Sequence, residues 1–239
     1  MWNWLLRGIW IILRLLSLRS HGQVSPNMIF IVTVFLIAHG LSFVHLCANW
    51  IGFRCTRTDV QTVNIFHGKT LASFPLLGTT FVIGCIPTGC GLKFDTEQFA
   101  RLALPVRLAV FLLGPASLLV LSAAVLRYDA ALHHFASGFS QFISGAMHPR
   151  TIAIELLTRL DAVFTSSFST LVGVLAAKIS AADLTPIGTC SGGRCVSELF
   201  SRYAERRWFT VIQVFNALIW FAILIAWGFA CFVYVIRGL

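Results

Sequence analysis

The amino-acid sequence predicts a mainly α-helical polytopic membrane protein with about four transmembrane helices, an N-terminal interfacial helix and a small membrane-associated β-hairpin or sheet. Composition is the first reason. Of the 239 residues, 57% are hydrophobic and 11% are charged, and the mean hydropathy is +0.83, whereas soluble domains carry about 25% charged residues. The second reason is four runs without Lys, Arg, Asp or Glu, over residues 20–53, 108–126, 162–177 and 208–236. A membrane-spanning helix needs roughly 17 to 25 apolar residues, so each run predicts one span.

The first two elements lie before residue 50. Residues 1–20 form an apolar run that Arg7 and Arg14 interrupt, and no small-residue cleavage site follows cleanly, which argues against a removed signal peptide. Because both arginines fall on one side of a helix, we expect it to lie in the membrane interface; a short tilted or re-entrant helix is the alternative. Ser25 and Pro26 are typical of a helix start, and the first transmembrane helix is expected over residues 28–49.

Residues 51–94 are expected to be β-rich and to lie on the cytoplasmic side. Thr, Val, Phe and Ile alternate there with polar residues, and glycines and prolines punctuate them. A strand is predicted over residues 79–83 and a turn over residues 86–89. Because open sheet edges are not tolerated against lipid, the sheet should lie at the interface or against protein.

The remaining elements complete a single membrane domain over residues 1–239. A second transmembrane helix is expected over residues 104–126, where Gly114 and Pro115 form a pair typical of close packing or a cavity. Residues 127–151 are predicted to be an interfacial helical connection, and residues 157–177 a third span rich in hydroxyls. Residues 181–196 should be a broken loop, buried in protein or lining a wet cavity. The fourth transmembrane helix is expected over residues 208–236.

The charge distribution predicts partners and orientation. The net charge is +9, but the Lys and Arg residues lie between apolar runs rather than on one polar surface. We therefore expect the lipid bilayer and other membrane proteins as partners, not nucleic acid. Basic residues concentrate in residues 47–107 and 178–207, which predicts that these connections are cytoplasmic and that both termini lie outside. The expected location is the bacterial inner (cytoplasmic) membrane.

Three local patterns occur in a fixed order along the chain. Residues 78–94 read GTTFVIGCIPTGCGLKF, residues 107–116 read RLAVFLLGPA, and residues 183–193 read DLTPIGTCSGG. Together they resemble the β-hairpin, the Gly-Pro span and the N-x-x-P-x-x-x-L-D-G-G loop of the site-2 proteases, a family of intramembrane zinc metalloproteases. The resemblance covers most of the chain between about residues 29 and 236.

The resemblance implies a zinc site whose ligands this chain lacks. The family holds its metal with an H-E-x-x-H run on the first helix and with the Asp of L-D-G-G. Aligned on residues 48–52, the two His positions are Gly40 and Val44, the Glu position is Leu41, and the third ligand position is Ser191. We therefore expect no catalytic residues, no metal and no cofactor.

Shifted registers restore only one histidine each. A shift of one residue brings His45 to the second ligand position, with Leu41 and Ser42 in place of the first His and the Glu; the opposite shift uses His39. No register restores a carboxylate, because the first acidic residue is Asp59. His39 and His45 are about 240° apart around a helix, so both cannot face one metal from a straight helix.

Two cysteine pairs flank the same region. Cys85 and Cys90, and likewise Cys190 and Cys195, are each separated by four residues. This spacing matches no standard metal or redox site, and the cytoplasmic side is reducing, so packing beside the glycines is the expected role.

The sequence therefore predicts a catalytically inactive, site-2-protease-like pseudoprotease that serves as a scaffold, assembly factor or integral subunit of a larger membrane complex. The family adds an extended segment to an exposed sheet edge, and we expect Phe81, Val82 and Ile83 to form that edge or, alternatively, to pack on the helices. One alternative function is an active protease with rearranged ligands, for which Asp161 and Asp183 are candidates. The other is a small transporter or channel subunit.

Overall fold

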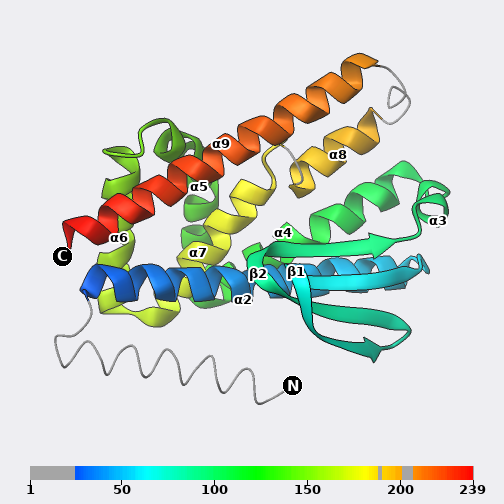
Figure 1. Cartoon of the computed structure of the whole chain (residues 1–239), viewed down its shortest axis with the longest axis horizontal. Helices are drawn as coiled ribbons and strands as arrows, with labels where there is room; N and C mark the ends of the chain where they lie inside the picture. Colours follow the sequence, from blue (N-terminus) through cyan, green and yellow to red (C-terminus); the bar gives the residue numbers. More distant parts are fainter. Residues whose placement is uncertain (1–24, 188–189, 201–206, 239) are drawn as a thin grey trace.

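The computed structural model describes residues 25–187, 190–200 and 207–238. Within these ranges the chain is mainly helical with a small sheet, in the order α2, β1, β2 and then α3 to α9 (Figure 1). This confirms the coarse fold class that the composition predicts. The predicted interfacial helix over residues 1–20 lies outside the described residues.

Among the described residues, three helices are long and apolar enough to cross a membrane. They are α2 (Pro26–Cys55), α4 (Leu104–Leu126) and α9 (Arg207–Arg237), which match the first, second and fourth predicted spans. Helix α2 extends to Cys55, past its predicted end at residue 49, and stops where the Thr56 hydroxyl hydrogen-bonds the carbonyl of Phe53. The start of α2 lies beside the end of α9, because the Asn27 side chain donates to the carbonyl of Tyr234 at 2.9 Å.

The predicted third span over residues 157–177 is not confirmed. Its residues belong to two helices, α6 (Ile152–Ser166) and α7 (Phe168–Asp183), of 15 and 16 residues. Ser167 separates them in an extended conformation, and its hydroxyl caps α7 by accepting from the Thr170 N–H. Serine and threonine hydroxyls compete with the helix for backbone groups and favour such caps, so the hydroxyl-rich run divides here.

The connecting helices are shorter. Helix α3 (Thr96–Ala100) is capped by Asp95, and α5 (Tyr128–Met147) fills most of the connection that the sequence predicts to be helical. Helix α8 (Ser191–Leu199) begins inside the predicted broken loop over residues 181–196. Because α7 continues to Asp183, the described non-helical residues of this loop are 184–187 and Cys190.

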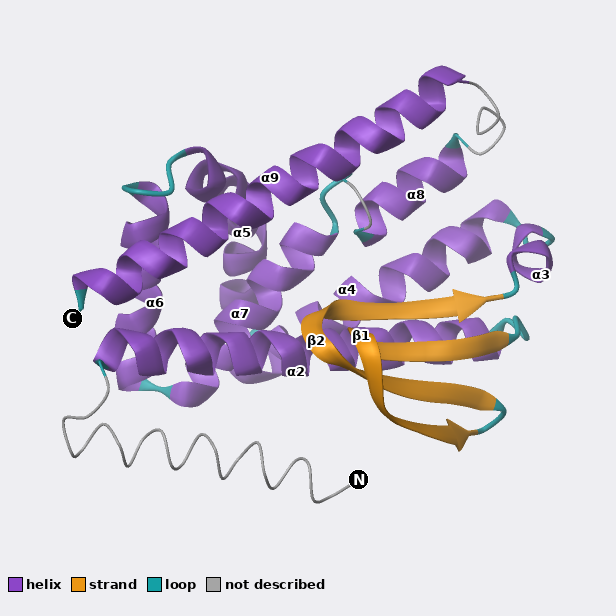
Figure 2. Ribbon diagram, in the orientation of Figure 1, coloured by secondary structure: helices purple, strands orange, loops and turns teal. Residues whose placement is uncertain are grey.

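The sheet consists of two long antiparallel strands, β1 (Val60–Leu76) and β2 (Thr79–Phe94), shown in Figure 2. Leu77 and Gly78 join them with φ values of 50° and 77°, as in the two-residue turns that match the twist of a hairpin. The prediction of a turn over residues 86–89 is wrong, since these residues lie within β2.

The two strands bend so that one part of the hairpin lies beside the other. Val63 pairs with both Leu92 and Phe81, and Phe81 pairs in addition with Phe74. Residues 81–83 therefore have strand partners on both sides, and the prediction that Phe81, Val82 and Ile83 form an exposed edge is wrong. Phe81 is only 5% exposed, and its ring meets the Trp50 ring of α2 edge-on. Apolar packing against α2 draws this segment into the interior of the sheet.

The outer position in the sheet belongs to residues 70–76 of β1, which we call the outer edge. They pair with residues 79–84 on one side, and no other described strand pairs with them on the other side. The face of the sheet packs on α2 and α4 through one apolar core cluster, and the helices form two further clusters. The first cluster contains Leu46 and the third contains Leu41, so residue 45 of α2 lies between two apolar regions.

Candidate functional site

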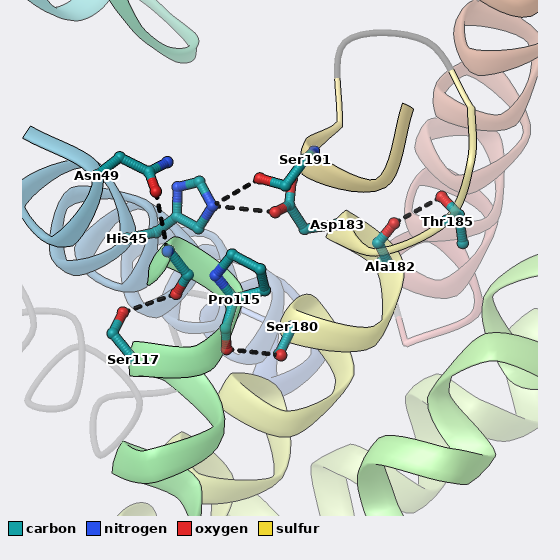
Figure 3. A network of polar contacts seen from close by, with 10 residues as sticks. His45, Asn49, Pro115, Ser117, Ser180, Ala182, Asp183, Thr185 and Ser191 are labelled. Carbon is teal, nitrogen blue, oxygen red and sulfur yellow. Dashed lines mark hydrogen bonds and ion pairs between the residues drawn. The ribbon is translucent and has the colours of Figure 1, made fainter. Parts of the chain in front are cut away.

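Polar groups from four helices, three of which contribute side chains and one a backbone N–H, meet between these two apolar regions. We call this group the polar junction; it consists of His45 and Asn49 on α2, Gly114 on α4, Asp183 at the end of α7 and Ser191 at the start of α8 (Figure 3). His45 and Asn49 are four residues apart and therefore share one face of α2. The junction thus occupies the region in which the sequence predicts a lost metal site.

Pro115 explains the part of the junction on α4. Proline within a helix has no N–H and displaces the preceding turn, so nearby backbone groups need other partners. The Gly114 N–H donates to the Asn49 side-chain oxygen at 2.9 Å, and the Pro115 carbonyl accepts from the Ser180 hydroxyl at 2.8 Å. Side chains of α2 and α7 therefore hydrogen-bond the backbone of α4 at Gly114 and Pro115, which stay within the helix.

Gly114 also makes room for His45. A Cβ atom at residue 114 would lie 2.2 Å from His45 Nε2, so only glycine allows the imidazole to lie against α4. In this position His45 Nε2 is 3.0 Å from Asp183 Oδ2 and 3.4 Å from Ser191 Oγ. Because an ionised carboxylate only accepts hydrogen bonds, the imidazole donates to Asp183.

Asp183 receives a second hydrogen bond from the start of α8. The Ser191 N–H donates to Asp183 Oδ1 at 3.2 Å, and the N-terminal end of a helix favours a negative charge. Burial acts to raise the pKa of the Asp183 carboxyl, but the hydrogen bonds with His45 and Ser191 outweigh burial and hold the pKa below its ordinary value. Gly192 allows the start of α8 to lie close to the end of α7, because a Cβ atom at residue 192 would lie 2.2 Å from the Leu184 carbonyl oxygen.

Of the four degenerate family positions, the structure brings only Ser191 into the junction. Ser191 is 4% exposed and lies against His45. Gly40 is exposed with open space beside it, Val44 is 39% exposed, and Leu41 is buried in an apolar core cluster. His45 rather than Val44 therefore faces Ser191, which agrees with the alternative register shifted by one residue.

The other ionisable candidates lie elsewhere. His39 Nδ1 is 2.7 Å from the Phe35 carbonyl oxygen, and its ring contacts Phe35 and Phe66. Asp161 accepts a hydrogen bond of 3.0 Å from the Tyr234 hydroxyl and so connects α6 to α9. Of the two acids that the sequence offers as rearranged ligands, Asp161 and Asp183, only Asp183 is hydrogen-bonded to a histidine of α2.

The junction does not fit a zinc centre. Catalytic zinc takes three protein ligands and structural zinc takes four, whereas His45 and Asp183 supply two. Within the described ranges, no three His, Cys, Asp or Glu side chains are grouped so that they could hold a metal ion. Burial and the nearby Asp183 raise the pKa of the Cys190 thiol to about 12, so it stays protonated and is a poor ligand or nucleophile.

The set Ser191, His45 and Asp183 has the residue types of a serine hydrolase but not the geometry. In a catalytic triad the serine and the acid contact opposite nitrogens of the imidazole ring. Here both contact Nε2, so the acid competes with the serine for one nitrogen. The arrangement can join α2, α7 and α8 by hydrogen bonds, and it cannot activate Ser191 by the triad mechanism.

The four cysteines of the two closely spaced pairs form no disulfide. Cys85, Cys90, Cys190 and Cys195 are all free thiols, and Cys85 is exposed whereas Cys190 is buried.

No protein-family model matches this chain, and a search of curated proteins finds no significant match. The resemblance to site-2 proteases therefore rests on the three sequence segments and remains a proposal. The sequence contains signals for four residues of the junction, since it singles out Gly114 and Ser191 and keeps His45 and Asp183 as alternatives. Asn49 and the outer edge were not identified, although a buried asparagine within a predicted span is a signal of a polar contact.

Proposed function

We propose that this chain is a non-catalytic, site-2-protease-like membrane protein that holds an extended segment of a membrane partner along the outer edge of β1. It would act as a scaffold, an assembly factor or a subunit of a larger membrane complex. The proposal places the chain in the bacterial inner membrane. The positions of the basic residues favour an orientation with both termini outside.

The observation that carries the proposal is the open side of residues 70–76. Leu76 and Thr79 flank a two-residue turn, so they form a hydrogen-bonded pair, and such pairs alternate along antiparallel strands. Ser73 and Pro75 therefore belong to non-hydrogen-bonded pairs, in which the backbone N–H and C=O groups point away from the neighbouring strand β2. Extended peptides commonly bind by adding a strand to such an edge.

The side chains of the outer edge suit a membrane partner. Leu71 is 63% exposed and Leu76 is 43% exposed, so a partner could cover apolar surface as well as pair with the backbone. Pro75 has no N–H to offer, and the exposed Lys69 precedes the edge. Proline and lysine are the residues with which natural proteins limit edge-to-edge aggregation, which favours a selective partner over self-association.

The polar junction supports binding without cleavage. His45, Asp183 and Ser191 are hydrogen-bonded to one another, and Asn49 is committed to the backbone of α4. The region that carries the chemistry in the resembling family is thus used here to hold helices together.

A proline substitution at the edge tests this proposal. Ser73→Pro removes an N–H that points to the open side and leaves the pairing with β2 intact, whereas the matched Ser73→Ala keeps the N–H. After purification from native membranes in gentle detergent, we expect wild type and Ser73→Ala to retain a stoichiometric partner and Ser73→Pro to lose it. Equal recovery of a partner by all three forms would contradict the role of the edge, and a lone chain in every case would contradict the scaffold function.

The contact between His45 and Asp183 supports a second candidate function, a protease with rearranged ligands. Two zinc-ligand types lie 3.0 Å apart there, although the third ligand and the base have no evident source. Metal analysis of the purified chain distinguishes the two functions. Stoichiometric zinc that is lost in His45→Ala would favour the protease.

A further inference from the structure

A second feature lies in the helical part of the molecule, away from the sheet. Helices α5, α6 and α7, with contributions from α2 and α9, surround a cavity of about 590 Å³. This volume is within the roughly 300–1,000 Å³ of small-molecule sites. Helices α5 and α6 lie at the end of the molecule away from the sheet (Figure 1), and no residue of β1 or β2 is among the described lining residues, so the cavity is separate from the outer edge.

The walls of the cavity are mostly apolar. Aliphatic side chains from three helices and one indole from a fourth form them: Val34, Leu157, Leu160, Val174, Leu175 and Trp227. Trp227 is fixed in the wall, because its Nε1–H donates to the Phe142 carbonyl at 3.0 Å. Such a lining suits a hydrocarbon chain, for which burial away from water is the main favourable term.

One side of the cavity is cationic. Lys178 of α7 donates to the side-chain oxygen of Gln141 on α5, which is a neutral acceptor. His133 and His134 line the cavity beside it, and no Asp or Glu is among the lining residues that the structure describes. Arg159 also lines the cavity but is paired with Glu155. Lys178 is thus a half-buried cation whose partner is an amide rather than a carboxylate.

An unmatched cation in an apolar surrounding is costly, and an anion beside it would offset that cost. Burial lowers the pKa of the Lys178 amine, as expected for a charge that lacks a counter-ion. An occupant with a hydrocarbon chain and one negative head would satisfy both the walls and Lys178. Gln141, Ser137 and His134 would then add neutral hydrogen-bonding groups around the head.

We propose that this cavity binds a single-chain anionic amphiphile, of which a long-chain fatty acid is the simplest example, with Lys178 as the residue that holds its head. The inference does not depend on the proposed function, because it uses none of the residues of the outer edge or the polar junction.

Equilibrium binding to the purified full chain in nanodiscs tests the proposal. The probes are radiolabelled palmitate, hexadecyl phosphate and the neutral hexadecanol, which share one chain and differ in the head. We expect saturable binding of palmitate, and about ten-fold or more weaker binding by Lys178→Gln, since a hydrogen bond to a charged group is lost. Lys178→Arg should bind like the wild type, as should the control Lys69→Gln, whose exposed side chain lies on the sheet.

The three probes also distinguish the heads. Tighter binding of hexadecyl phosphate than of palmitate, with the same dependence on Lys178, would assign a phosphate-bearing lipid as the occupant. Hexadecanol should bind more weakly than palmitate and be insensitive to Lys178→Gln. A second variant, Leu156→Trp, adds bulk to the cavity wall and should weaken all three probes without removing a charge.

Three results would overturn the proposal. They are the absence of saturable palmitate binding to the wild type, equal palmitate affinity of wild type and Lys178→Gln, or equal affinity of the wild type for palmitate and hexadecanol. If Lys178→Gln does not fold, the other two variants test the proposal. We expect Lys178→Arg to retain palmitate binding and Leu156→Trp to lose it.

Discussion

Gly114 offers the sharpest test of the polar junction. In Gly114→Ala the new methyl group would lie 2.2 Å from His45 Nε2, far inside van der Waals contact. The imidazole must then move, and its 3.0 Å contact with Asp183 is lost. Overpacking of a well-packed site costs about 1–3 kcal/mol, so we expect a loss of unfolding free energy of that order.

The assay is equilibrium unfolding of the solubilised chain in mixed micelles of a mild detergent and sodium dodecyl sulfate. The matched control is Gly40→Ala, the same change on α2 at an exposed position with nothing within 4 Å. Alanine is a better helix former than glycine by about 0.8–1 kcal/mol, so the control should be neutral or stabilising. We therefore expect Gly114→Ala to lower the free energy of unfolding and Gly40→Ala not to lower it.

A double-mutant cycle identifies His45 as the cause. In His45→Ala the space beside residue 114 is open, so Gly114→Ala should no longer destabilise the chain. The expected coupling energy between the two sites is about 1–2 kcal/mol. The reasoning would be refuted if Gly114→Ala were as stable as the wild type, or if its cost were the same with and without the imidazole.

Further predictions concern the same junction. Because the folded-state pKa of Asp183 is below its ordinary value of 3.8, its contribution to stability is fully present above that pH and is lost as the pH falls through the lower, folded-state value. Unfolding curves between neutral and acidic pH should show this loss in the wild type and not in Asp183→Asn. Asn49→Leu leaves the Gly114 N–H without its acceptor and should cost about 1–3 kcal/mol; unchanged stability in mixed micelles would contradict this. Cys190 is buried and protonated, so mass spectrometry should find that iodoacetamide modifies the exposed Cys85 first, and faster labelling of Cys190 would contradict its placement.

The coarse fold could be predicted from the sequence because long uncharged runs leave few alternatives. The division of the third predicted span into two helices could not be predicted from hydropathy, because hydropathy carries no information about the Ser167 hydroxyl as a helix cap. Pro87 and Gly89 are strong turn signals, so the sequence predicts a turn over residues 86–89. The chain instead turns at Leu77 and Gly78, and a leucine with positive φ gives no such signal.

The site was only partly predictable for a different reason. Motif spacing located Ser191 and the Gly-Pro pair, and it kept His45 and Asp183 as alternatives. It could not show that His45 faces Ser191 while Val44 faces outward, because a shift of one residue rotates a helix by about 100°. The sequence predicts the wrong edge, residues 81–83, because strand order in a bent hairpin depends on tertiary pairing rather than on the residues of one strand.

Site-specific photo-crosslinking from the outer edge in native membranes is the most direct test of the central claim. A photoreactive amino acid would replace Leu71 on the edge or, as a control, the exposed Met147 on α5. We predict one discrete adduct with a membrane protein from position 71, which disappears when Ser73→Pro is introduced and persists with Ser73→Ala. Adducts of equal yield from position 147, or an adduct from position 71 that Ser73→Pro does not affect, would contradict the account.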